Sequence, residues 1–193
     1  MGARKTDGRV RYTKAMLKNS FIDLLEQKDI SHISIKEVCE GADINRATFY
    51  AHYTDLYDLM RQIQDELLQN IQQHLAAYMQ NDESDVTRSM LERIFDYIRE
   101  NAKICKLLLG ERGDLHFQKR IFLLAYERNI KDLTLRHKIP DQEAEYIYAF
   151  ILTGSIGIVQ KWLNDPMEAN QRFVIETINR LTAGLSMAGA GEA

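Results

Sequence analysis

Hardly anything in this sequence interrupts a helix. Only two prolines and ten glycines occur in 193 residues, and alternating apolar and polar runs are nearly absent. Apolar residues instead recur at steps of three and four, the spacing of one face of an α-helix. We therefore expect an all-α protein of about nine helices.

Short, capped patterns open the chain. A first helix is expected over 12–27. Ser34-Ile-Lys-Glu37 is a capping-box sequence and predicts a second helix from Ser34. Asp43, which tolerates left-handed backbone, is expected to follow it, and Asn45 can cap a third helix over 46–53.

Longer amphipathic patterns follow. A fourth helix is expected to open after Thr54-Asp55 and to end near Asn81. Turn signals separate the later helices, which we expect over 86–100, 104–109, 115–136, 141–163 and 168–187. We place a first domain at 1–60, a second at 61–187 and a frayed tail at 188–193.

Several functional classes are disfavoured by the sequence. No apolar run reaches the ~18 residues of a membrane span, and the N-terminus lacks the apolar core of a signal peptide, so we expect a cytoplasmic protein without a membrane partner. Five histidines lie in separate segments, and no phosphate-binding glycine loop or nucleophile elbow occurs. We expect no enzyme activity, metal or cofactor. Cys39 and Cys105 are interpreted as buried thiols.

Charge is distributed unevenly, although its sum is only −3. Residues 1–18 hold six basic residues and one acid, a net +5 ahead of a remainder of −8. One interpretation of this basic arm is a solvated terminus; the other is a contact with nucleic acid.

The segment around the third helix favours nucleic acid. Arg46 and Tyr50 lie four residues apart on one helix face, and Thr48 and His52 form a second pair. Arginine and threonine at the exposed start of a short helix suit base edges in a major groove, whereas Tyr50 and His52 suit phosphates. Taken singly, each side chain is better explained by surface packing or capping than by a DNA contact. Together with the basic arm, the set indicates a helix-turn-helix.

Residues 12–60 resemble the DNA-binding domain of the TetR/AcrR family of bacterial transcriptional regulators, most clearly in "SIKEVCEGADINRATFYAHYTDLYDL". The segment "AFILTGSIGIVQKWL" is similar to the C-terminal region of a subgroup. The resemblance implies a three-helix DNA-binding head, a linking fourth helix, and a helical body that binds a ligand and dimerises through two helices near the C-terminus.

Pattern and resemblance together give an expected DNA-contacting set: Arg9, Arg11, Lys14, Ser34, Asn45, Arg46, Ala47, Thr48, Tyr50, His52 and Tyr53. Tyr53 is also expected in the core of the head. Two residues depart from the family pattern. Asp43 stands where glycine is common in the turn, and Leu56 stands where a lysine usually grips a phosphate.

The body offers two further expectations. Apolar arcs on its last two helices, with glycines that permit close approach, predict a homodimer interface of Ile147, Ile151, Gly154, Ile158, Trp162, Phe173, Ile178, Leu181 and Leu185. If a small-molecule effector exists, we expect its pocket to be lined by Tyr97, Cys105, His116 and Tyr126. Packing inside one chain is the alternative for every one of these residues.

The sequence thus predicts a homodimeric transcriptional repressor that binds a palindromic operator in double-stranded DNA and is released by an effector. The rival is a helical protein–protein module that acts through a partner protein with weak or no DNA binding.

Overall fold

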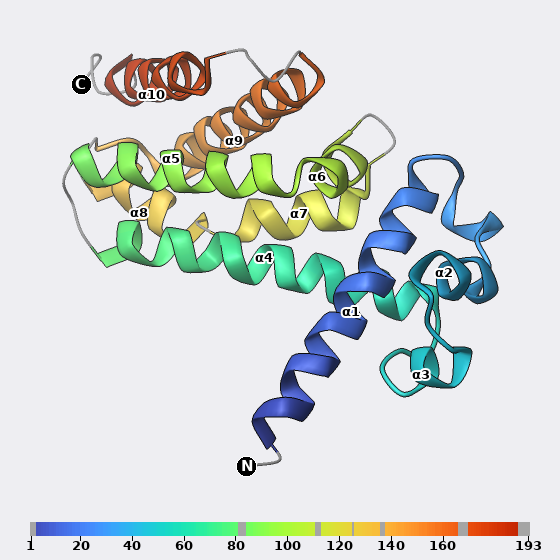
Figure 1. Cartoon of the computed structure of the whole chain (residues 1–193). Coiled ribbons are helices and arrows are strands. Elements are labelled where there is room, and N and C mark those ends of the chain that lie inside the picture. The colour runs from blue at the N-terminus through green and yellow to red at the C-terminus, as the bar shows by residue number, and fades with distance from the viewer. Residues whose placement is uncertain are drawn as a thin grey trace. The chain divides into compact units, whose positions relative to one another are not determined.

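The computed structural model of the chain describes residues 3–80, 84–110, 113–124, 126–135, 138–165 and 170–188. Every regular element in these ranges is helical, so the predicted all-α class is confirmed. Ten α-helices and one 3₁₀ turn follow in order (Figure 1): α1 (Ala3–Leu25), η1 (Ile30–His32), α2 (Ile35–Ala42), α3 (Arg46–Tyr50), α4 (Leu56–Gln80), α5 (Ser84–Glu100), α6 (Ala102–Leu109), α7 (Leu115–Leu123), α8 (Tyr126–Leu135), α9 (Asp141–Asn164) and α10 (Gln171–Ala188).

The chain divides into two compact units, an N-terminal unit of Met1–Leu67 and a C-terminal unit of Leu68–Ala193. Helix α4 contributes its first half to one unit and its second half to the other. The functional domains that we assigned to 1–60 and 61–187 remain predictions. Residues 189–193 of the predicted tail lie outside the described residues.

Helices α1, α2 and α3 share a small core in the N-terminal unit. Leu17 and Phe21 of α1, Val38 of α2 and Phe49 of α3 are completely buried. A five-residue helix such as α3 is not stable by itself, because its few hydrogen bonds do not offset the entropy of forming the first turn. Burial of Phe49 therefore holds α3 in place.

Helices α1 and α2 approach closely at Gly41. A Cβ built on Gly41 would lie 2.4 Å from the Ser20 Oγ. That hydroxyl is buried and donates a hydrogen bond of 2.9 Å to the Val38 carbonyl oxygen. Glycine thus leaves the space in which Ser20 can bond to the α2 backbone.

Helix α9 is the centre of the C-terminal unit, where it packs against α6, α8 and α10. Trp162 lies against Phe95 of α5 with ring centroids 4.9 Å apart, and Tyr148 lies against Tyr126 of α8 at 5.4 Å. Cys105 of α6 is fully buried and Cys39 nearly so, as predicted.

Helix boundaries depart most from the predictions in three places. Helix α1 begins at Ala3, although residues 3–11 carry no apolar periodicity. Helix α3 ends at Tyr50, because the next N–H groups fold back in a turn: His52 and Tyr53 both bond to the Phe49 carbonyl. The predicted helix 115–136 is two helices, and no glycine or proline marks the break between them.

Candidate nucleic-acid interface

Ser34 starts α2 through the predicted capping box. The Ser34 Oγ accepts the Glu37 N–H at 3.3 Å, and a Glu37 carboxylate oxygen accepts the Ser34 N–H at 2.9 Å. The Ser34 hydroxyl itself donates to Glu37 at 2.8 Å. Because the single hydrogen of its hydroxyl is already donated inside the cap, the Ser34 side chain would reach a phosphate only by exchanging that bond.

Glu37 also forms an ion pair with a lysine of the loop after α1. The Lys28 Nζ lies 2.5 Å from a Glu37 carboxylate oxygen. The hydrogen bond from Lys28, followed by those from Ser34, lowers the Glu37 pKa from its ordinary value of 4.5 to about 2. Glu37 is therefore ionised at neutral pH and fixes the start of α2.

The turn from α2 to α3 forms as the sequence predicted. Asp43 adopts left-handed backbone at φ 53° and its N–H bonds back to the last turn of α2. Asn45 caps α3, its Oδ1 accepting the Ala47 N–H at 2.8 Å. The first residue of α3, Arg46, thus directly follows a cap of fixed geometry.

Helix α3 separates its buried and exposed side chains sharply. Phe49 is 0% exposed, whereas Tyr50 is 58% exposed and packs edge-on against Phe49 at 5.7 Å. Arg46 and Ala47 are exposed and Thr48 is half-buried. A guanidinium, a small residue and a phenol are consequently presented to solvent by one short helix.

Tyr53 differs from the rest of the predicted contact set. It is 5% exposed, and burial, together with the Glu66 and Asp58 charges, raises its pKa to about 12. The Lys14 Nζ lies 5.7 Å from its ring centroid, close enough for a cation–π contact. Tyr53 is a core residue that positions Lys14, and half-buried His52 lies beside it.

The start of α4 carries acids and no lysine. Leu56 is 7% exposed, so the position where the family usually has a lysine belongs to the core of the head. Asp55 accepts the Asp58 N–H at 2.7 Å, and Asp58 accepts the Thr54 N–H at 2.9 Å. Tyr57, which follows Leu56, is 55% exposed.

Two further polar side chains, which were not predicted, lie beside α3. Lys36 and Glu40 of α2 line a hollow there together with Asp43 and Arg46. Spacing on α2 could have identified Lys36 and Glu40, which form an i,i+4 pair at 3.6 Å.

The four predicted ligand-lining residues have different surroundings in the C-terminal unit. Cys105 is buried, His116 is exposed at the start of α7, Tyr97 packs on His74, and the Tyr126 hydroxyl bonds to Glu145 at 3.1 Å. Their role remains a prediction.

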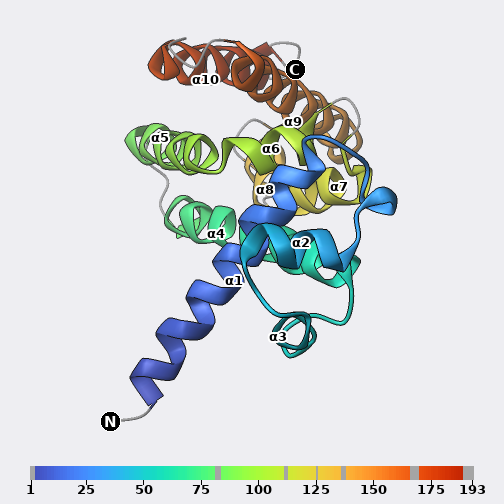
Figure 2. The same cartoon turned by 45° about the vertical axis from the view of Figure 1, so that its right-hand side comes forward.

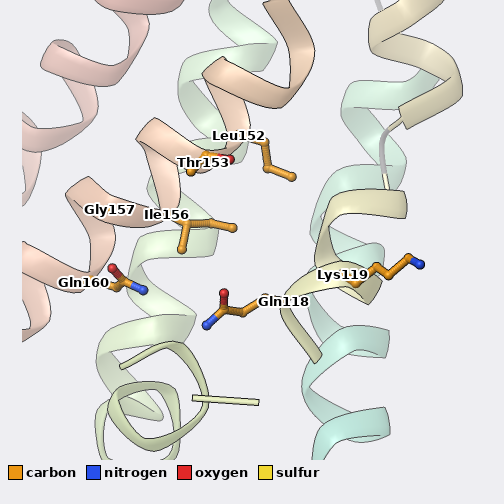
Figure 3. Close-up of a pocket in the computed structure, with 7 residues that line it drawn as sticks. All are labelled: Gln118, Lys119, Leu152, Thr153, Ile156, Gly157 and Gln160. Atoms are coloured by element: carbon orange, nitrogen blue, oxygen red, sulfur yellow. The ribbon is translucent and has the colours of Figure 1, made fainter. Parts of the chain in front are cut away.

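A groove of about 340 Å³ lies instead between α7 and α9. Gln118 and Gln160 point toward each other across it, whereas Lys119 turns away (Figure 3). Gln160 also donates a hydrogen bond to the Leu109 carbonyl. The remaining lining residues are Leu152, Thr153, Ile156 and Gly157.

The predicted dimer residues differ in how deeply they are buried. Trp162 and Ile178 are 2% and 5% exposed and pack inside the chain, whereas Phe173 and Leu181 of α10 are 63% and 53% exposed. Gly154 of α9 is also exposed, and three other α9 positions are half-buried: Ile147, Ile151 and Ile158. The side chain of Leu185 lies outside those described.

Tyr146 and Phe150 of α9 are 72% and 66% exposed, although neither was among the predicted dimer residues.

Metal sites and membrane spans are both absent from the part of the chain that the structure describes. No group of three His, Cys, Asp or Glu side chains there is placed to hold a metal ion. No described helix is long and apolar enough to cross a membrane.

Comparison with known proteins agrees with this fold. A family model of the TetR type, described as "Transcriptional regulator C-terminal region", matches residues 85–184, just over half of the chain. The chain therefore belongs to the TetR family of transcriptional regulators.

Two curated relatives carry the same class of name. A helix-turn-helix-type transcriptional regulator of Bacillus subtilis (strain 168), YxbF, is 22% identical over 88% of this chain and 44% of its own length. Another, from Haemophilus influenzae (strain Rd), is 26% identical over 69% of this chain and 62% of its own length. The chain thus spans less than two thirds of either relative.

Solved structures show the same fold. A TetR transcriptional regulator from Streptococcus agalactiae 2603V aligns with a TM-score of 0.61 and 22% identity over 94% of this chain and 99% of that one. The dihydroxyacetone kinase operon activator DhaS aligns at 0.58 with 18% identity over 92% and 97%.

Proposed function

We propose that this regulator binds a palindromic operator in double-stranded DNA as a homodimer and acts in the cytoplasm as a repressor. The observation that carries the proposal is the surface of α3. Its cap and its buried Phe49 fix the helix, and Arg46, Ala47 and Tyr50 remain exposed on it. A rigid helix that exposes a guanidinium at its start suits base readout in a major groove.

The side chains on and next to α3 have the following proposed roles. Arg46 pairs with a guanine edge, and Ala47 and Thr48 contact a neighbouring base or thymine methyl group. Tyr50 and His52 bond to phosphates and fix the register of the helix. Asn45 holds the start of α3 through its cap.

The homodimer part of the proposal is supported by the surfaces of α9 and α10. A Cβ built on Gly154, Gly157 or Gly184 would meet nothing within 4 Å, so packing inside one protomer does not require these glycines. Each costs about 1 kcal/mol of helix stability relative to alanine. Close approach of a second copy beside exposed Phe150 would offset that cost.

Release from the operator requires an effector that distinguishes two states of the protein. We propose the groove between α7 and α9 as its site, because the groove combines an apolar wall at Ile156 with the amides of Gln118 and Gln160. The effector must bind better when the two heads are at a spacing that the operator does not fit, or it will leave DNA binding unchanged.

Site selection from a random duplex pool tests the DNA-binding proposal. The wild-type protein should enrich a palindrome, because two symmetric heads read two half-sites. Arg46→Ala should weaken or abolish the preference for one base, reducing the discrimination against the other bases at that position by about 1–3 kcal/mol. Tyr50→Phe should weaken binding without changing the preferred sequence.

Lys131→Ala is the matched control, since Lys131 is an exposed cation of α8 in the C-terminal unit. It should bind the selected duplex as the wild type does. Failure of the wild-type protein to enrich any sequence at low salt would contradict the proposal and favour the rival, a regulator that acts through a protein partner.

A further inference from the structure

Helices α7 and α9 share two neighbours, since both pack against α6 and α8 (Figures 1 and 2). The groove of about 340 Å³ lies between α7 and α9, and its volume is near the lower limit for sites that bind small molecules. Two residues of α7 and five of α9 line it. A molecule in the groove would therefore contact both helices at once.

The amide of Gln160 has a fixed orientation in this groove. Its Nε2 donates a hydrogen bond to the Leu109 carbonyl oxygen at the end of α6. Because a carbonyl oxygen only accepts hydrogen bonds, this contact determines which end of the amide carries the N–H groups. The second N–H of Gln160 and its Oε1 remain for a ligand.

The amide of Gln118 lies across the groove from Gln160. Gln118 is half-buried, and its side chain has no hydrogen-bond partner among the described residues. The two amides point toward each other (Figure 3). Together they offer a donor and an acceptor to one ligand, and a ligand with an N–H next to a C=O is the complement of such a pair.

The described lining of the groove presents no charge to a ligand. Lys119 is the one charged side chain among these lining residues, and it turns away from the groove (Figure 3). Lys161, the residue after Gln160, is exposed and pairs with Asp165 at 3.0 Å. An ionised ligand would lose hydration without gaining a counter-charge, so the groove disfavours anions and cations alike.

Leu152 and Ile156 give the groove an apolar wall. Both side chains extend from α9 into the groove (Figure 3). The hydrocarbon part of a ring would cover this wall and remove apolar surface from water, whereas a polyol would set hydroxyl groups against it. The wall therefore favours a ring over a polyol.

We propose that the groove binds an uncharged cyclic amide, a ring in which an N–H donor lies next to a carbonyl acceptor. The ligand carbonyl accepts the second N–H of Gln160, and the ligand N–H donates to the Gln118 Oε1. The hydrocarbon part of the ring covers Leu152 and Ile156. The inference rests on the effector site proposed above and names the chemical class of the effector.

A panel of small compounds tests this class on the full-length protein without DNA. The probes are δ-valerolactam, the acceptor-only ring cyclohexanone, the anion cyclohexanecarboxylate, protonated piperidine and glycerol. Amide chemical shifts of the lining residues should move with δ-valerolactam, with a dissociation constant of roughly 1–10 mM for so small a ligand. Cyclohexanone should bind about tenfold more weakly, because it has no N–H for Gln118. The two ions and glycerol should cause no saturable shift.

Matched variants test the contact at Gln118. Gln118→Leu should weaken δ-valerolactam binding about tenfold, because it removes one hydrogen-bond partner of the ligand. Its thermal unfolding should stay near that of the wild type, since the Gln118 side chain bonds to no described group. Gln142→Leu is the control, because Gln142 is an exposed glutamine of α9 that does not line the groove. It should bind δ-valerolactam as the wild type does.

Gln118→Glu tests the part played by charge. The carboxylate removes the donor of Gln118 and places a negative charge in the groove, so protonated piperidine should now bind better than δ-valerolactam. An unchanged preference for the lactam in Gln118→Glu would contradict a ligand that lies against this side chain.

Saturable shifts of the lining residues with an ion or with glycerol, but not with δ-valerolactam, would overturn the cyclic-amide class. Equal affinities of Gln118→Leu and Gln142→Leu for the lactam, or no shift with any of the five probes, would also overturn it. The effector role fails separately: a lactam that fills the groove and leaves the affinity for the selected duplex unchanged would support the ligand class and contradict the effector site.

Discussion

Asp43, in the turn before α3, has a strained left-handed backbone, and its negative charge is unfavourable for DNA binding. Its φ is 53°, a conformation that costs most non-glycine residues about 1–2 kcal/mol, and Asp43 lines the hollow next to α3 together with Arg46. Asp43→Gly should raise the free energy of unfolding by roughly 0.5–1 kcal/mol, because glycine relieves the strain but loses more chain entropy.

Asp43→Asn separates the two effects. It removes the charge while keeping a side chain that tolerates left-handed backbone, so it should tighten DNA binding with little change in stability. Urea unfolding and duplex titration measure both quantities. An Asp43→Gly variant no more stable than the wild type would show that the turn carries no strain at this residue.

The capping box at Glu37 predicts a pH dependence. Its folded pKa of about 2 lies below the ordinary value of 4.5, so the stability it contributes is fully present above 4.5 and is lost as pH falls toward 2. Wild type should be more stable than Glu37→Gln at pH 6, and the difference should shrink between pH 4.5 and 3. Urea unfolding of both proteins across that range measures it, and a constant difference would contradict the Lys28–Glu37 interaction.

The packing of α2 on α1 depends on a pair of small residues. Gly41→Ala places a methyl group against the Ser20 Oγ and displaces the hydrogen bond to Val38, which should cost about 1–2 kcal/mol. In a Ser20→Ala background the same change should be neutral or stabilising, since the clash is gone and alanine favours the helix. A thermodynamic cycle over the four proteins measures the coupling, and additive effects would rule out the contact.

Local chemistry explains why some elements were predictable. Ser34 with Glu37, and Asn45 with the start of α3, act within three residues of each other, so the sequence alone placed both caps and the turn at Asp43. The start of α1 carries no apolar period, and the break between α7 and α8 carries no glycine or proline, so no local signal marked either boundary.

Contacts between distant segments explain what was not predictable. Periodicity identified α9 and α10 as apolar but could not tell which side faces inward: Trp162 and Ile178 are buried, whereas Tyr146 and Phe150 are exposed. The groove between α7 and α9 brings Gln118 and Gln160 together from far apart in the sequence, so residue type alone could not have found it.

The exposed aromatic face of α9 makes dimerisation testable without disturbing the fold. Phe150 is 66% exposed, so Phe150→Glu should leave the protomer folded. In a two-fold symmetric dimer the change occurs twice, removes apolar burial from both copies and sets like charges near each other. The dimer dissociation constant should rise at least about 100-fold, measurable by sedimentation.

Leu135→Glu is the control for Phe150→Glu, because Leu135 of α8 is 73% exposed and lies outside the proposed interface. It should remain dimeric and bind the selected palindrome normally. Phe150→Glu should keep the wild-type unfolding temperature. Its affinity for the palindromic duplex should fall more than its affinity for a duplex with a single half-site, since each head still reads its own bases. If the Phe150→Glu protein stayed dimeric, the dimer interface would have to lie on another face. Close approach of a second copy would then not explain the exposed glycines of α9.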